Sequence, residues 1–151
     1  MALKPFRDQL GWNTKYFMDE TAEAGGFVVG STYGSGAALD QGVALCTYAS
    51  NPSGKVVLGC LMQDVVDVNI RSHINFYKPE VQKGSKVALQ DKGSVETNMI
   101  YPGVTPTGGA SAYLGPSGLL ITTSGPGNPY VGYFESTKDE DGYASVRFNL
   151  P

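Results

Sequence analysis

The feature that most constrains the fold is a period of two near the end of the chain. In residues 143–150, Val146, Phe148 and Leu150 alternate with polar side chains. Successive side chains of a β-strand point to opposite faces, so this pattern predicts a strand with one buried and one exposed face. Another strand-forming run occupies residues 130–136, and an Asp-Gly pair between the two runs favours a tight turn. The chain is therefore predicted to end in a β-hairpin.

Short strands separated by turns are predicted through most of the remaining sequence. The chain has 20 glycines, 9 prolines, 9 tyrosines and 6 phenylalanines, a composition that favours strands and turns over helices. Residues 55–62 are almost continuously apolar and predict a central strand buried on both faces, in which Gly59 indicates a bulge or a close backbone approach. Residues 81–95 predict another hairpin, with its second turn at residues 91–93.

Glycine and proline are most concentrated in residues 102–129, of which five are proline and seven are glycine. A segment punctuated in this way does not form one regular element. Two short apolar runs, residues 112–114 and 119–123, are strand candidates on either side of a turn at residues 115–118. We therefore predict an ordered, extended excursion that packs on another part of the chain or on a partner.

Residues 1–24 differ from the rest, because they mix charges with large apolar groups and lack a clean period of two. We predict an N-terminal arm over residues 1–24, followed by a single β domain over residues 25–151 that carries the excursion at 102–129. The apolar groups of the arm either fold back onto the core or dock on a partner. The predicted fold is thus mainly β, a compact small β-barrel or sandwich with an extended N-terminal arm and a long Gly/Pro-rich excursion.

Charge and hydropathy argue against several classes of partner. The net charge is −3, only 17% of residues are charged, and the basic residues are scattered singly, so we expect no nucleic-acid partner. No apolar run approaches the ~20 residues of a membrane span, and the first residues lack the apolar stretch of a signal peptide. We expect neither a membrane partner nor export. Cys46 and Cys60 lie in apolar runs and are expected to be buried free thiols, although the sequence does not report the distance between them.

Residue patterns that support catalysis or metal binding are weak in this sequence. The chain has a single histidine, His73, and no Gly-x-Ser-x-Gly motif. Cys46, Cys60 and His73 offer three metal ligands, but without the close Cys pairs typical of structural zinc sites. Residues 139–142 gather carboxylates beside a glycine, but lack the spaced ligands of a calcium loop. We predict no catalytic residues, no metal and no cofactor, and therefore not an enzyme.

Several phrases along nearly the whole chain carry a resemblance to a known family. They are residues 23–29 (EAGGFVV), 52–59 (PSGKVVLG), 64–66 (DVV), 73–76 (HINF), 81–87 (VQKGSKV), 100–106 (IYPGVTP), 112–118 (AYLGPSG), 131–134 (VGYF) and 138–144 (KDEDGYA). Together they resemble head decoration, or cement, proteins of tailed bacteriophages. This resemblance implies a structural virion protein, made in the host cytoplasm, that binds the outer surface of an icosahedral capsid. It also implies a homotrimer that bridges subunits of the major capsid protein.

The resemblance suggests which side chains make contacts. Aromatic groups are the usual hot spots of interfaces, so the expected capsid-binding residues of the arm are Phe6, Trp12, Tyr16, Phe17 and Met18. A second set, for the capsid or for the trimer, is Tyr101, Tyr113, Leu114 and Leu119. The alternative function is a carbohydrate- or receptor-binding β module displayed on the virion surface, in which tyrosines stack on sugars.

Overall fold

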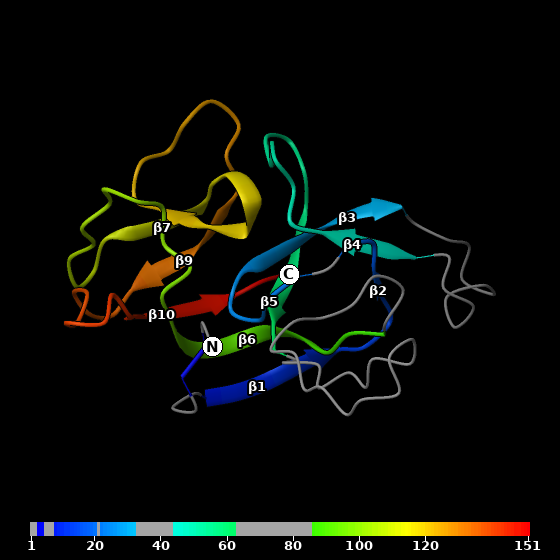
Figure 1. Cartoon of the computed structure of the whole chain (residues 1–151), viewed down its shortest axis with the longest axis horizontal. Helices are drawn as coiled ribbons and strands as arrows, with labels where there is room; N and C mark the ends of the chain where they lie inside the picture. The colour runs from blue at the N-terminus through cyan, green and yellow to red at the C-terminus, as the bar shows by residue number, and fades with distance from the viewer. Residues whose placement is uncertain (1–2, 5–7, 21, 33–43, 63–85) are drawn as a thin grey trace, which may run out of the picture.

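Ten strands form one sheet in the computed structural model, which describes residues 3–4, 8–20, 22–32, 44–62 and 86–151 (Figure 1). The strands are β1 (Asp8–Asn13), β2 (Phe17–Met18), β3 (Phe27–Thr32), β4 (Leu45–Thr47), β5 (Val57–Leu61), β6 (Leu89–Thr97), β7 (Ser111–Leu114), β8 (Leu120–Ile121), β9 (Tyr130–Phe134) and β10 (Ala144–Asn149). The expectation of a compact, mainly β fold is confirmed. The sheet follows an open path from β2 to β8 and does not close on itself.

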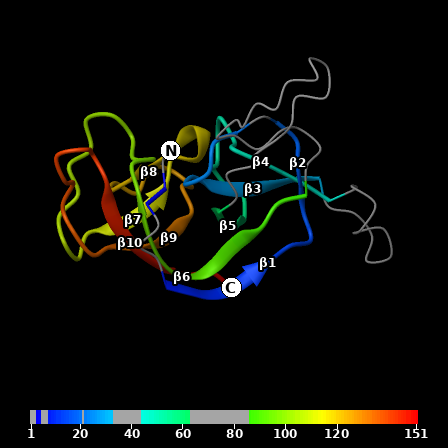
Figure 2. The same ribbon diagram turned by 60° about the horizontal axis from the view of Figure 1, so that its bottom comes forward.

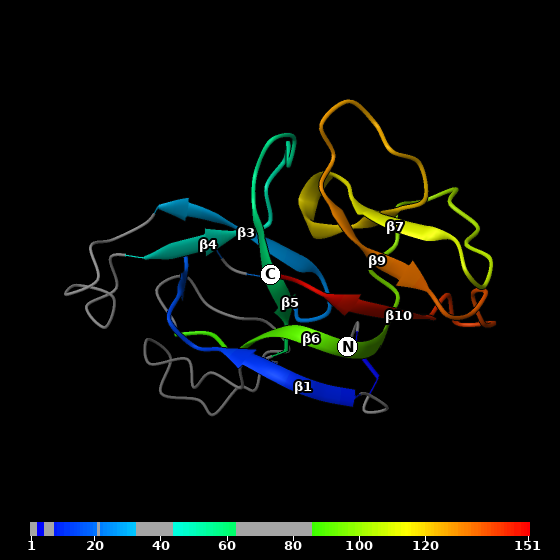
Figure 3. The same cartoon turned by 180° about the vertical axis from the view of Figure 1, so that it is seen from behind.

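Strand β6 lies at the centre of this sheet and is paired on both edges. Gln90 pairs with Trp12 of β1 and with Cys60 of β5, while Ser94 pairs with Asp8 of β1 and with Arg147 of β10. Strand β1 therefore follows one edge of β6, and β5 and β10 share the other edge. Figure 2 brings β6 and β1 forward, and Figure 3 shows from behind how β3 and β4 lie on one side of the molecule and β7 and β9 on the other.

The core has two clusters of buried side chains, one on each face of the central strands. In β3, Phe27 and Val29 belong to the first cluster, whereas Val28 belongs to the second. In β5, Cys60 and Leu61 divide in the same way, which confirms a central strand buried on both faces. The rings of Phe27 and Phe148 meet edge to face at 5.0 Å, joining β3 to β10. The period of two in β10 thus buries Val146 and Phe148 as predicted.

The turn expected at residues 91–93 is wrong, because these residues lie inside β6. Gly93 is buried with a φ of 127° and pairs with Gln9 on one side and Phe148 on the other. A positive φ is open to glycine at little cost. The Asp-Lys-Gly sequence of residues 91–93 therefore fits within β6, which is continuous and has neighbouring strands on both edges.

Part of the predicted arm is an integral strand. Residues 8–13 form β1, and the register of β1 against β6 shifts on both sides of Gly11. Such bulges insert extra residues and break the alternation of side chains, which explains the missing period of two. A Cβ at Gly11 would lie 2.2 Å from Asp91 Oδ1, so glycine allows this irregular pairing.

The Gly/Pro-rich excursion is ordered and contains the two predicted strands, β7 and β8. A short 3-10 turn over Pro116–Gly118 joins them, and Leu114 pairs with Leu120. The excursion contacts the other half of the molecule through Tyr48. A Cβ added at Gly118 would lie 2.5 Å from the Tyr48 ring, and one added at Gly26 would lie 2.8 Å from it.

No helix within the described part of the chain has the length and apolarity needed to cross a membrane.

At Gly132 the backbones of β9 and β10 lie too close to admit a side chain, and Gly132→Ala should destabilise the fold. A Cβ there would lie 2.0 Å from the carbonyl oxygen of Arg147 and 2.9 Å from Cα of Phe148. Because backbone atoms must move to make room, we expect the free energy of unfolding to fall by about 1–3 kcal/mol in urea denaturation.

Gly108→Ala is the matched control for this substitution, since its Cβ would meet its nearest neighbour, the carbonyl oxygen of Glu135, at 3.4 Å. Equal stabilities of the two variants would show that β9 and β10 have room to separate at Gly132.

Candidate functional site

The structure separates the expected arm residues into exposed and buried groups. Trp12 is 51% exposed on β1, and Leu10 of the same strand, which was not among the predicted contacts, is 62% exposed. Tyr16 and Phe17 are partly buried. Met18 is fully buried, with its Sδ 3.8 Å from Sγ of Cys46, because β2 pairs with β4. The surface contact predicted for Met18 is therefore wrong for this fold. Phe6 lies outside the described residues.

The second set of predicted contacts is also divided. Tyr101 is exposed, and Tyr113 and Leu119 are partly buried. Leu114 is buried, because β7 alternates and turns Ala112 and Leu114 into the core. A surface contact of Leu114 is thus ruled out by its packing, and Tyr101 is the most accessible member of this set.

A bulge in β9 brings two further tyrosines onto one exposed face. Against β7, Gly132 pairs with Ala112 and Tyr130 pairs with Tyr113, so Val131 is an extra residue in β9. Side chains three positions apart in a regular strand point to opposite faces. The bulge changes this phase, and Tyr130 and Tyr133 are both exposed, at 57% and 43%.

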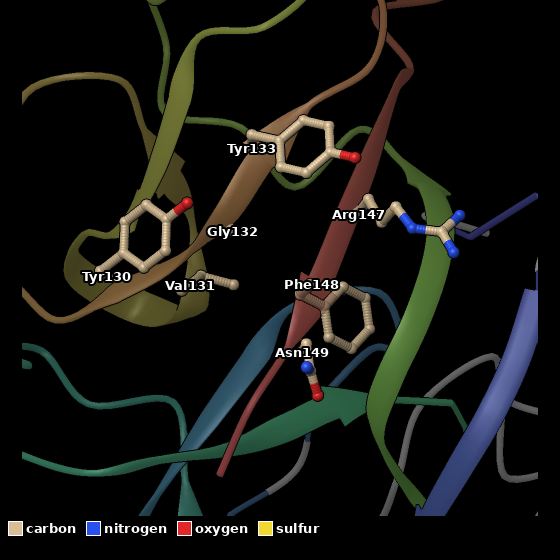
Figure 4. Close-up of a pocket in the computed structure, with 7 residues that line it drawn as sticks. All are labelled: Tyr130, Val131, Gly132, Tyr133, Arg147, Phe148 and Asn149. Carbon is tan, nitrogen blue, oxygen red and sulfur yellow. The ribbon is translucent and has the colours of Figure 1, made fainter.

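These tyrosines border a groove of about 200 Å³ between β9 and β10 (Figure 4). The groove is lined by Tyr130, Val131, Gly132, Tyr133, Arg147, Phe148 and Asn149. The pairing of β9 with β10 extends only from Phe134 to Gly132, so the groove lies where this ladder ends. Arg147 and Asn149 supply polar groups beside an apolar and aromatic floor. Sequence reasoning did not find this site, because the bulge that assembles it has no sequence signal of its own.

A second hollow, of about 220 Å³, lies at the tip of the C-terminal hairpin. There Lys4 Nζ donates a hydrogen bond of 2.6 Å to Asp139, and it also lies 4.6 Å from the centre of the Tyr143 ring. Asp139 also accepts hydrogen bonds from the amides of Tyr143 and Asp141. The Lys4 hydrogen bond is the largest of the effects that lower the pKa of Asp139. This carboxylate therefore fastens the N-terminal segment to the hairpin.

The structure places both cysteines in the core. Cys46 and Cys60 are buried and are not joined by a disulfide. Burial, with smaller contributions from Glu20 and Asp19, raises the pKa of Cys46 to about 12, so this thiol stays protonated near neutral pH. No group of three or more His, Cys, Asp or Glu side chains in the described ranges is arranged to hold a metal ion, and His73 lies outside those ranges.

No protein-family model matches the chain, and no similar sequence is found among characterised proteins.

The ion pair between Lys4 and Asp139 predicts a lowered pKa for the Asp139 carboxyl. In the folded chain the carboxyl of Asp139 should titrate below its ordinary pKa of 3.8, and Lys4→Met should raise that pKa part of the way back, because the backbone amides still donate. A depressed pKa means that the interaction stabilises the fold above the unfolded value and that this stabilisation is lost as pH falls through the folded pKa. NMR titration of the Asp139 carboxyl carbon measures its pKa in the wild type and in Lys4→Met.

Lys138→Met is the control, since Lys138 precedes Asp139 but makes no ion pair with the described residues. An unchanged Asp139 titration in Lys4→Met would contradict the assigned cause of the shift.

Proposed function

We propose that this chain is a non-enzymatic decoration protein of a tailed-bacteriophage head. It binds the outer surface of the icosahedral capsid as a homotrimer and bridges subunits of the major capsid protein. Support comes from the sequence phrases that resemble this family and from the exposed apolar surface of β1. The proposed location is the outside of the virion.

The observation that carries the proposal is the exposed pair Leu10 and Trp12 on β1. Exposed large apolar side chains are typical of interfaces, and tryptophan is prominent among interface hot spots. This pair is presented by a strand that is hydrogen-bonded along β6. Because folding already orders the strand, binding through it costs less conformational freedom than binding through a loose arm.

Stabilisation of a shell follows from linked binding equilibria. A protein that binds adjacent capsid subunits only while they stay together adds its binding free energy to the assembled state. Three copies of one anchor in a trimer engage with a high effective concentration, which strengthens attachment without new kinds of contact. A trimer of this chain needs no catalytic group to do this work.

Cosedimentation with expanded heads that lack the protein, prepared from the phage that encodes it, tests the proposal. The wild-type chain should bind in stoichiometric amounts, and the double variant Leu10→Ser, Trp12→Ala should weaken binding roughly thirtyfold, as expected for loss of a hot spot. Point substitutions are preferable to deleting residues 1–18, because that deletion removes β1 and the buried Met18.

Val56→Ser is the matched control, since Val56 is 60% exposed in a different region. Its head binding should equal that of the wild type, and thermal melting should show all variants folded. Failure of the wild-type chain to bind heads would refute the function, and normal binding of the double variant would refute the anchor. Sedimentation velocity of the wild type tests the trimer.

A further inference from the structure

We propose that the groove between β9 and β10 binds one pyranose ring of a glycan, with Tyr130 and Tyr133 as stacking surfaces and Arg147 and Asn149 as hydrogen-bonding groups. This inference is independent of head binding. The groove lies on β9 and β10, whereas Leu10 and Trp12 lie on β1. Sugar binding and head binding are therefore tested by separate measurements.

The aromatic part of the groove is fixed before any ligand arrives. Figure 4 shows the rings of Tyr130 and Tyr133 each turning a face toward the viewer, with the Tyr130 ring on the β7 side of β9 and the Tyr133 ring on the β10 side. The ring of Tyr113 meets Tyr130 edge to face at 5.6 Å, which restricts the Tyr130 ring. One face of a pyranose carries mainly C–H groups, and these pack against the electron-rich face of an aromatic ring. The restricted ring of Tyr130 therefore offers a sugar contact area at low entropic cost.

The polar rim is suited to hydroxyl groups. Sugar hydroxyls both donate and accept, the guanidinium of Arg147 only donates, and the amide of Asn149 does both. Within the described residues, Arg147 Nη1 forms an ion pair with Glu135 Oε1 at 3.9 Å, a distance too long for a hydrogen bond. Asn149 has no side-chain hydrogen bond within the part of the chain that the structure describes. Both groups are thus available to orient a ligand.

The size of the groove selects among ligand classes. Pockets for drug-sized molecules usually enclose about 300–1,000 Å³. The present groove, at about 200 Å³, suits a single ring from which the rest of a glycan chain extends into solvent. A stable protein contact instead buries about 800 Å² on each partner, much more than this groove presents.

NMR titration of the isotope-labelled chain with methyl pyranosides tests the site. The panel contains glucose, galactose, mannose, N-acetylglucosamine and glucuronate, at millimolar concentrations suited to single-ring affinities. We expect saturable shifts confined to the amides of residues 130–133 and 147–149 for at least one sugar. Tyr130→Ala and Tyr133→Ala should each weaken its binding about tenfold, the size expected for loss of one stacking ring.

Tyr101→Ala is the matched control, because Tyr101 is 43% exposed, as Tyr133 is, but lies away from the groove. Its sugar affinity should be that of the wild type. Tyr133→Phe should bind nearly normally if the ring face makes the contact. Unchanged melting temperatures would show that the alanine variants remain folded.

Three results would overturn the proposal. The first is the absence of saturable shifts with every pyranoside, and the second is binding that both alanine variants leave intact. The third is a protein contact, in which Tyr130→Ala and Tyr133→Ala dissociate the trimer or prevent head binding while the wild type binds no sugar. Normal sugar binding by a chain that fails to bind heads would refute only the decoration function.

Discussion

The pairing of β6 on both edges is the constraint on which the other strands depend. Buried backbone amides and carbonyls need partners, and β6 obtains them from three strands that are far apart in the sequence. Even its last residue, Thr97, is buried, donating its hydroxyl to the carbonyl of Gly25 and accepting from the amide of Met99. The N-terminal strand is therefore part of the scaffold, since its loss would leave one edge of β6 unpaired.

Tyr48 connects the excursion to the rest of the sheet. Its hydroxyl donates to the carbonyl of Glu23 and accepts from the amide of Gly26, while its ring packs at Gly118. Burial raises the pKa of this phenol well above its ordinary value, in keeping with a hydroxyl used only for hydrogen bonding. Gly118, which lies in the Gly/Pro-rich segment, leaves room for this large ring and lets the segment pack against it. The same residues that rule out a regular element thus permit close packing.

The sequence predicted the regular parts of this fold and missed the irregular ones. The period of two over residues 143–150 and the apolar run over residues 55–62 correspond to β10 and β5, because local pattern and burial agree there. The bulges in β1 remove the period of two that would have predicted this strand. The sequence around Gly93 is typical of a turn, but pairing on both edges holds Gly93 in β6. Burial of Met18 depends on the neighbour β4, which no local pattern reveals.

The exposed residues of β1 and the groove between β9 and β10 differ in chemistry. Leu10 and Trp12 are exposed on β1 and line neither of the two hollows, which suits contact with a protein surface. Tyr130 and Tyr133 stand beside Arg147 and Asn149, which suits a ligand rich in hydroxyls. Strands β6 and β10 lie between β1 and β9 in the sheet. The proposed capsid-binding pair and the proposed sugar groove therefore lie on strands that are not neighbours in the sheet.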